Sequence, residues 1–193
     1  MKYICENKSG EKMNFIVKNI NTLFHGKVFD VRVDDIEYSG SGNIGIREVA
    51  VHPGGAVVLP LKSDGKIVLI TQYRYPNNEV LLELPAGKLE KGEDPFLCAS
   101  RELTEETGYT SNNLTKLGKI YTTPGFCDEV LHIYLAEDLI SGDHAREEGE
   151  EGMEIVELTL REVEEKIRNG EIVDAKTISG IYFYKLLMEH RSL

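Results

Sequence analysis

The sequence predicts an α/β protein in which helices cover both faces of a sheet, with a small β appendage at the N-terminus. Two observations support this prediction. Residues 15–38 tend to alternate polar and apolar side chains, which is the period-two pattern of half-buried strands. The rest of the chain mixes short apolar runs, typical of buried strands, with longer segments whose apolar residues recur at helical spacing.

The N-terminal region is predicted to form a β subdomain over residues 1–50. Its alternation is clearest over residues 29–34, and a glycine-rich stretch at 39–45 then separates it from another apparent strand at 46–51. A hairpin turn is the simplest interpretation of that stretch. The glycines also match the G-x-G-x-x-G dinucleotide fingerprint, but that fingerprint requires a following helix rather than a strand. We therefore reject a dinucleotide site and expect the main domain over residues 51–193.

The main domain is predicted to interleave strands and helices. Asp94 as N-cap, Pro95 at the first helical position and Gly108 as the stop bracket its first helix. Strands are expected at residues 56–60, 66–70, 80–84, 116–122, 130–135 and 154–158, and two further helices at 159–168 and 175–189. The last helix is expected to turn its large apolar residues inward: Ile178, Ile181, Tyr182, Leu186 and Leu187.

Composition excludes several classes of protein. The formal net charge of -11 does not suit a nucleic-acid partner, because neutralising phosphates needs clustered Lys and Arg. An acidic protein that handles phosphates must recruit cations. The three cysteines are widely spaced and form no CxxC pair, so neither a disulfide framework nor a zinc site is expected. No signal peptide or membrane-spanning run is apparent, and we expect a cytoplasmic protein without a membrane partner.

Three carboxylates are predicted to gather on one side of the first helix. Glu102 precedes Glu105 and Glu106 by three and four residues, a spacing that places side chains on the same helical face. Like charges so placed repel one another, and a hard cation such as Mg²⁺ or Mn²⁺ would remove that penalty. The alternative interpretation is an ordinary solvated acidic face.

The segment that contains these carboxylates resembles the Nudix box, G-x5-E-x7-R-E-U-x-E-E-x-G-U, in which U is apolar. Leu103 fits the first U position, and Tyr109 is a slightly polar substitute at the second. Every other defined position of the box is met, by Gly87, Glu93, Arg101, Glu102, Glu105, Glu106 and Gly108. The resemblance implies a Nudix α/β/α sandwich with a mixed sheet, in which a metal-activated water attacks one phosphorus of a pyrophosphate.

The resemblance also implies roles for individual residues. Arg101 would orient Glu93 and the other glutamates through charge-assisted hydrogen bonds, and Glu93, Arg101 and Glu105 would serve catalysis. The expected cofactor is Mg²⁺, with Mn²⁺ as a substitute. Its implied ligands are Glu102 and Glu106, with Glu105 and the backbone carbonyl of Ala86 in addition.

An acidic stretch at residues 147–151 lies where ADP-ribose pyrophosphatases, a Nudix subgroup, carry a mobile loop. The resemblance assigns Glu151 to a further metal ligand. Gly149 stands where a catalytic glutamate often sits, so the general base is assigned to Glu148 or Glu150. Such a run is also typical of a flexible solvated loop, and a lid could be both.

Pro124 strengthens the resemblance to the same subgroup, because it follows Gly108 by sixteen residues. There the β appendage pairs with a second subunit and helps to bind the nucleotide, so a homodimer through residues 1–50 is expected. The implied substrate contacts are Arg47, Glu48, Arg74, Pro124 and Glu129. Exposed charges in ordinary ion pairs are the alternative for the charged members of this set. The predicted reaction converts ADP-ribose to AMP and ribose 5-phosphate; the alternatives are another nucleotide sugar such as GDP-mannose, or a non-catalytic nucleotide-binding module.

Overall fold

The computed structural model describes residues 3–6, 12–142 and 152–191, and the chain divides into two compact units. The first unit comprises Met1–Pro53 and Thr123–Glu129, and the second comprises Gly54–Thr122 and Val130–Leu193. In the described part of the chain, no helix is both long and apolar enough to cross a membrane.

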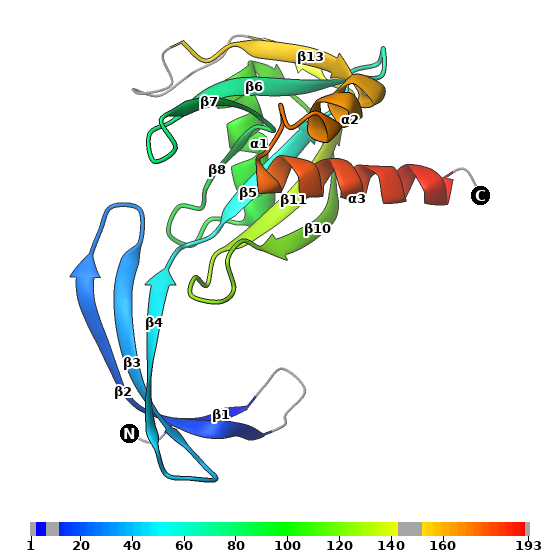
Figure 1. Ribbon diagram of the computed structural model, residues 1–193. Helices are drawn as coiled ribbons and strands as arrows, with labels where there is room; N and C mark the ends of the chain where they lie inside the picture. The colour runs from blue at the N-terminus through cyan, green and yellow to red at the C-terminus, as the bar shows by residue number, and fades with distance from the viewer. Residues whose placement is uncertain (1–2, 7–11, 143–151, 192–193) are drawn as a thin grey trace. The chain divides into compact units, whose positions relative to one another are not determined.

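The first unit is a four-stranded antiparallel sheet (Figure 1). Its strands pair in chain order: β1 (Tyr3–Glu6), β2 (Lys12–His25), β3 (Asp30–Tyr38) and β4 (Ile44–Val51). The glycine-rich stretch connects β3 to β4, which confirms the predicted hairpin turn. Because the following element is a strand, the rejection of a dinucleotide fingerprint is also confirmed.

One segment joins the first unit from far along the chain. Residues 123–129 run beside the end of β4, where the backbone N–H of Ala50 donates to the carbonyl of Phe126 (2.8 Å) and that of Asp128 donates to the carbonyl of Ala50 (3.2 Å). The Asp128 carboxylate accepts from the backbone N–H of His52 (2.8 Å). Pro124, which lies in this segment, therefore folds with the N-terminal strands.

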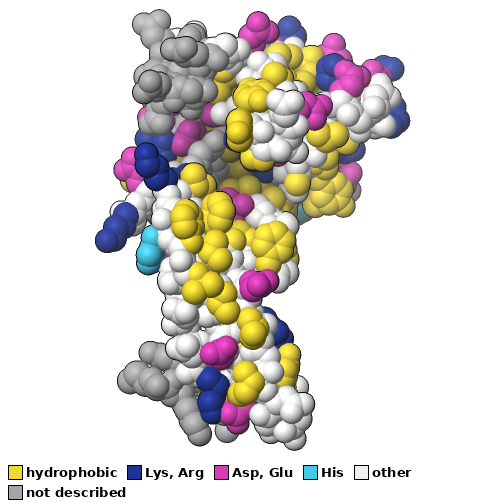
Figure 2. All heavy atoms as spheres, turned by 60° about the vertical axis from the view of Figure 1, so that its left-hand side comes forward, with side chains coloured by type: hydrophobic (Ala, Val, Ile, Leu, Met, Phe, Trp, Pro, Cys, Tyr) yellow, Lys and Arg dark blue, Asp and Glu magenta, His cyan; other side chains and the backbone are white. Residues whose placement is uncertain are grey.

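Hydrophobic side chains gather on the face of the first unit that Figure 2 presents. Strands β2 and β4 expose large apolar residues, among them Leu23, Phe24, Ile44 and Ile46. Long exposed strands that carry apolar side chains are unusual in a sheet that stays alone in water. This unit thus offers a surface suited to association.

The second unit interleaves strands and helices, as predicted. Its four-stranded sheet has the order β10-β11-β5-β8 and is mixed, because β11 runs parallel to β5 while the other pairs are antiparallel. A three-stranded antiparallel sheet has the order β13-β6-β7, and β9 pairs with β12. The strands are β5 (Gly55–Pro60), β6 (Lys66–Arg74), β7 (Glu79–Glu83), β8 (Ala86–Lys88), β9 (Tyr109–Thr110), β10 (Asn113–Tyr121), β11 (Val130–Glu137), β12 (Ile140–Ser141) and β13 (Ile155–Thr159). The helices are α1 (Pro95–Thr107), α2 (Leu160–Arg168) and α3 (Ala175–Arg191).

Helices cover both faces of β5, which confirms the predicted sandwich (Figure 1). Successive side chains of a strand point to opposite faces. Accordingly, Ala56 and Val58 pack in one cluster with Leu103 of α1, whereas Val57 packs in another with Ile181 of α3. All six residues of β5 are buried, so the strand lies at the centre of the fold.

The inward face of α3 differs from the prediction. Tyr182 is 62% exposed and Leu186 is also exposed, so both assignments were wrong. The prediction is confirmed for Ile181, which is buried, and for Ile178 and Leu187, which pack partly buried against the core. Gly180 and Tyr184 also face inward. A Cβ at Gly180 would lie 2.6 Å from the Leu84 side chain, so the helix approaches the sheet closely at a residue with no side chain. Tyr182 follows Ile181 by about 100° around the helix and therefore leaves that face.

Candidate active site

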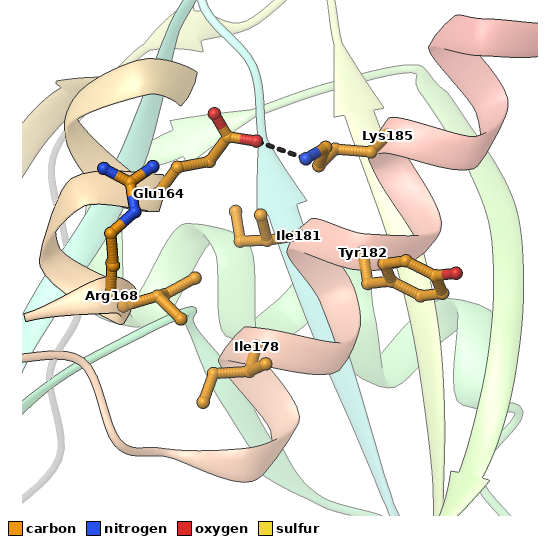
Figure 3. A pocket seen from close by; sticks show the side chains of 7 residues that line it. Glu164, Arg168, Ile178, Ile181, Tyr182 and Lys185 are labelled. Atoms are coloured by element: carbon orange, nitrogen blue, oxygen red, sulfur yellow. Dashed lines mark ion pairs between the residues drawn. The ribbon is translucent and has the colours of Figure 1, made fainter. Parts of the chain in front are cut away.

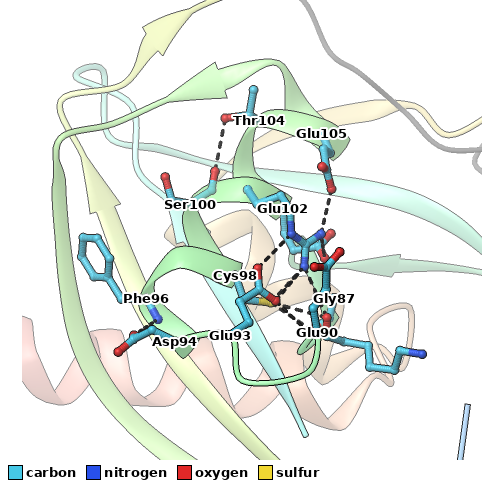
Figure 4. A network of polar contacts seen from close by, with 12 residues as sticks. Gly87, Glu90, Glu93, Asp94, Phe96, Cys98, Ser100, Glu102, Thr104 and Glu105 are labelled. Carbon is cyan, nitrogen blue, oxygen red and sulfur yellow. Dashed lines mark hydrogen bonds and ion pairs between the residues drawn. The ribbon is translucent and has the colours of Figure 1, made fainter. Parts of the chain in front are cut away.

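Helix α1 holds its carboxylates in place because both of its ends are capped as predicted. The Asp94 side chain accepts from the backbone N–H of Phe96 (2.8 Å), and Pro95 occupies the first helical turn. Gly108 ends the helix in the left-handed conformation (φ 72°), which glycine adopts without steric cost. Figure 4 shows Glu93, Glu102 and Glu105 pointing into one polar network at the side of this helix.

Two of the helix carboxylates are buried. Glu102 is 6% exposed and Glu106 is 2% exposed, so the alternative of a solvated acidic face does not describe them. Glu106 accepts a hydrogen bond from the backbone N–H of Ala86 (2.9 Å). A Cβ at Gly87 would lie 1.7 Å from an oxygen of Glu102, so this carboxylate fills the space that a side chain would need. Both carboxylates therefore lie against strand β8.

Arg101 connects the remaining glutamates of the segment. Its Nε and Nη2 donate to the two oxygens of Glu93 (3.1 and 3.2 Å), while its Nη1 donates to Glu102 (2.6 Å) and Glu105 (2.9 Å). The hydrogen bond from Arg101 lowers the pKa of Glu93, and the reciprocal contact raises the pKa of Arg101. The guanidinium therefore stays charged and keeps three carboxylates together that would otherwise repel.

These side chains border a pocket of about 260 Å³ in the second unit. Besides Ala86 and the helix glutamates, Arg74 lines it and brings a second guanidinium to the same hollow. The complete lining is Gln72, Arg74, Ala86, Gly87, Lys88, Glu90, Arg101, Glu102, Glu105 and Glu106. A polar pocket with both carboxylates and guanidinium groups can bind a cation and a phosphate side by side.

The donor atoms of the pocket fit a hard divalent cation. Carboxylate oxygens are the ligands that Mg²⁺ and Mn²⁺ prefer, and two buried carboxylates beside each other are costly unless positive charge compensates them. Within residues 3–6, 12–142 and 152–191, no three acidic, histidine or cysteine side chains stand in a ready coordinating arrangement. Arg101 supplies positive charge to Glu102 and Glu105 instead. Glu102, Glu105 and Glu106 nevertheless line one hollow.

The other predicted substrate contacts belong to the first unit. Arg47 and Glu48 are exposed on β4, where Arg47 donates to the Tyr38 hydroxyl (2.7 Å). Pro124 is exposed, and Glu129 pairs with Nδ1 of His52 (3.1 Å). The predicted loop residues Glu148, Gly149, Glu150 and Glu151 lie outside the described residues.

Sequence reasoning did not select several residues of the pocket and its surroundings. Gln72, Lys88 and Glu90 line the pocket, and Glu83 lies behind Arg74, which donates to it from Nε (2.8 Å) and Nη2 (2.6 Å). Glu83 did leave a signal, because it is the one charged residue in the apolar run 80–84. A charge at a buried strand position normally has a partner.

A larger hollow of about 420 Å³ lies between α2 and α3, away from these carboxylates (Figure 3). Its floor is apolar, with Ile178 and Ile181, and Glu164 already forms an ion pair with Lys185 across it. A hollow with a single, paired carboxylate offers no set of oxygen ligands. The smaller pocket is therefore the candidate active site.

The fold and the polar pocket suit a hydrolase that acts on phosphate compounds. A family model described as "NUDIX domain" matches residues 51–179, and the chain belongs to this family of Nudix hydrolases. Enzymes of the family generally need a divalent metal ion.

Curated relatives agree with this assignment. An ADP-ribose pyrophosphatase of Bacillus subtilis (strain 168) is 44% identical over 165 residues, which cover 85% of this chain and 89% of that protein. A methanol dehydrogenase activator of Bacillus methanolicus is 40% identical over 89% of this chain and 94% of its own. A GDP-mannose pyrophosphatase of Cronobacter sakazakii is 36% identical over 76% of this chain and 78% of that protein.

A solved structure confirms the fold. The crystal structure of an ADP compounds hydrolase superposes with a TM-score of 0.82, covering 93% of this chain and 96% of that one at 22% identity. The predicted Nudix α/β/α sandwich is therefore the observed architecture.

Proposed function

We propose that the protein hydrolyses ADP-ribose to AMP and ribose 5-phosphate, with Mg²⁺ as its cofactor. The observation that carries the proposal is the burial of Glu102 and Glu106 against β8, in a pocket that also contains two arginines. Such an arrangement suits a diphosphate and a cation together. The choice of ADP-ribose is supported by the 44% identical relative that bears this activity in its name.

Some residues of the pocket would bind the cation, and Arg101 would hold carboxylates in position. Glu102 and Glu106 would hold the cation, with Glu105 and the Ala86 carbonyl as additional ligands. Bound there, a divalent cation supplies charge neutralisation at the diphosphate and lowers the pKa of an attacking water. Arg101 keeps Glu105 and Glu93 in position through the contacts described above.

Water is added across one P–O–P linkage in this reaction. The attacked phosphorus gains the water oxygen, and the other phosphate leaves with the bridging oxygen. Arg74 would bind the diphosphate because its guanidinium lines the pocket. The proposed base is Glu148 or Glu150, and Glu151 is the proposed further ligand.

The first unit is proposed to complete the enzyme as a homodimer interface and to contribute Arg47, Glu48, Pro124 and Glu129 to nucleotide binding. The exposed apolar side chains of β2 and β4 support association with a second copy. The net charge of -11 supports the proposal that nucleic acid is not a partner. The widely spaced cysteines support a reducing compartment such as the cytoplasm, and Cys98 and Cys127 are both free thiols.

Two alternative functions have specific support. The 36% identical GDP-mannose pyrophosphatase favours another nucleotide sugar as substrate. The 40% identical methanol dehydrogenase activator favours a regulatory role. A regulatory module without catalysis would be expected to have lost carboxylates of the box, whereas this chain has all of them.

A substrate panel distinguishes these functions. Purified protein with Mg²⁺ is incubated with ADP-ribose, GDP-mannose and diadenosine polyphosphates, and kcat/KM is measured for each. We expect ADP-ribose to give the highest value, with AMP and ribose 5-phosphate in equal amounts. A higher kcat/KM for GDP-mannose would identify GDP-mannose as the better substrate and contradict the choice of ADP-ribose. The absence of hydrolysis of every compound would favour the regulatory role.

A further inference from the structure

A buried carboxylate lies immediately behind the candidate active site. Glu83, the last residue of β7, is 1% exposed, and its two oxygens accept from Nε (2.8 Å) and Nη2 (2.6 Å) of Arg74. The ammonium of Lys176 also contacts this carboxylate, at the same oxygen, Oε2, that accepts from Nη2 of Arg74. One buried anion is thus held between two cations that come from β6 and α3.

The charges around Glu83 alternate in sign. Lys176 also pairs with Asp174 (3.0 Å), and Asp174 accepts from the backbone N–H (2.9 Å) and hydroxyl (2.6 Å) of Thr177 at the start of α3. Burial alone would raise the pKa of Glu83, but the hydrogen bond from Arg74 and the charge of Lys176 together lower it. The carboxylate is therefore ionised at neutral pH, and removing it would leave the Arg74 guanidinium without this partner, while Lys176 would keep its contact with Asp174.

This arrangement fixes the direction of Arg74. Arginine is a long side chain, and it must lose much rotamer freedom before it can bind a ligand in one geometry. Two of its three guanidinium nitrogens are committed to Glu83, and among the described residues no hydrogen bond is made by its third, Nη1. The side chain is still 37% exposed and lines the pocket. The two N–H groups of Nη1 and the second N–H of Nη2 are therefore left to donate to an anion.

Lys176 helps to fix the carboxylate that orients Arg74. Its ammonium contacts both Glu83 and Asp174, so the four side chains carry two positive and two negative charges. A buried carboxylate that is held by a second cation has little freedom to move away from the guanidinium. Glu83 therefore orients Arg74, and Lys176 holds Glu83.

We infer that Glu83, supported by Lys176, is a positioning residue that holds Arg74 in the geometry in which it binds the diphosphate of the substrate. The inference rests on the proposed function for the identity of that diphosphate. Glu83 and Lys176 both lie outside the Nudix box, and they are 93 positions apart in the chain. A positional error of about 1 Å in such a group can cost on the order of a hundredfold in rate.

A double-mutant cycle tests the inference. The kcat and KM for ADP-ribose are measured for the wild type, Glu83→Gln, Arg74→Ala and the double variant, together with the dissociation constant for ADP by calorimetry. We expect Glu83→Gln to raise KM and weaken ADP binding by about tenfold, with a smaller change in kcat. In the Arg74→Ala background the same substitution should change either quantity by less than about twofold, since its target is gone.

Two further variants keep the test decisive. Glu157→Gln is the matched control, because Glu157 is also a strand glutamate held by a lysine, Lys62, but lies outside the pocket; its KM should match that of the wild type. If Glu83→Gln does not fold, Glu83→Gln/Lys176→Met removes the buried lysine charge together with its partner, and it takes the place of Glu83→Gln in the cycle.

The possible outcomes separate the two proposals. Equal effects of Glu83→Gln with and without Arg74 would overturn the positioning role and leave a structural one. An Arg74→Ala variant with normal KM and normal ADP binding would overturn it as well. A wild type that binds ADP but hydrolyses no ADP-ribose would contradict the proposed function, while the ADP-binding arm of the cycle would still decide the role of Glu83.

Discussion

Each buried carboxylate around the pocket has a partner that holds it: Arg101 for Glu102, the backbone N–H of Ala86 for Glu106, and Arg74 for Glu83. The Nudix box identified Glu102, Glu106 and Arg101 because their spacing is a property of consecutive positions. The partners of Arg74 were not predictable in the same way, since Glu83 and Lys176 meet only when β7 and α3 pack together. Long-range contacts of this kind leave only an indirect trace in a sequence, here a charge within an apolar run.

The lowered pKa of Glu83 predicts how stability depends on pH. A carboxyl whose pKa is lower in the folded state stabilises the fold fully above the ordinary glutamate pKa of about 4.3, and that contribution is lost as the pH falls through the lower, folded-state pKa. Glu83→Gln should reduce the free energy of unfolding at pH 7 by about 3 kcal/mol. As the pH falls from 5 to 3, the free energy of unfolding of Glu83→Gln should also decrease less than that of the wild type. This pH range is chosen because it contains the ordinary glutamate pKa. Urea denaturation at each pH measures both effects, and parallel pH profiles would contradict the assignment.

At the scale of elements, strand β8 packs against the carboxylates of the site, and the sequence did not predict this strand. Helix α1 carries its own start and stop residues, so local sequence was sufficient to define it. Strand β8 has three residues and exists because Ala86 and Gly87 pair with β5, about thirty positions earlier. Neither apolar periodicity nor turn residues identify so short a strand.

Gly87 of β8 leaves room for the Glu102 carboxylate, and substituting it should therefore disturb the site. In Gly87→Ala the new Cβ would occupy the position of the Glu102 carboxylate, so that carboxylate must move. We expect weaker Mg²⁺ activation and a loss of turnover of at least about tenfold, with little change in the thermal midpoint. Gly40→Ala is the matched control, because a Cβ there meets no atom within 4 Å. Equal activity of the two variants would show that the close contact has no role.

At the scale of the whole molecule, the alternating pattern of the N-terminal segment predicted its strands but not everything that packs with them. Residues 123–129 join the first unit by pairing with Ala50, more than seventy positions away. A proline and a glycine in that segment indicate a turn, and nothing local indicates which strand the turn will meet. The assignment of residues to compact units therefore needed the structure.

The exposed apolar residues of the first unit lead to a prediction about assembly. We expect light scattering to give the mass of a dimer at micromolar concentration. Ile46→Lys should shift the protein toward the monomer, because it places a charge among those residues. Ile140→Lys is the control, since Ile140 is similarly exposed but belongs to the second unit. A monomeric wild type would contradict a shared nucleotide site.

The buried carboxylates of α1 are proposed to support metal-dependent cleavage of ADP-ribose. The most direct measurement is a Mg²⁺ titration of ADP-ribose hydrolysis by the wild type and by Glu106→Gln, with AMP and ribose 5-phosphate quantified. Glutamine can still accept the hydrogen bond from Ala86, so the fold should persist while turnover falls by orders of magnitude. We expect no turnover by the wild type in a chelator and saturation as Mg²⁺ rises. Near-normal turnover by Glu106→Gln, or by the wild type without metal, would contradict the account.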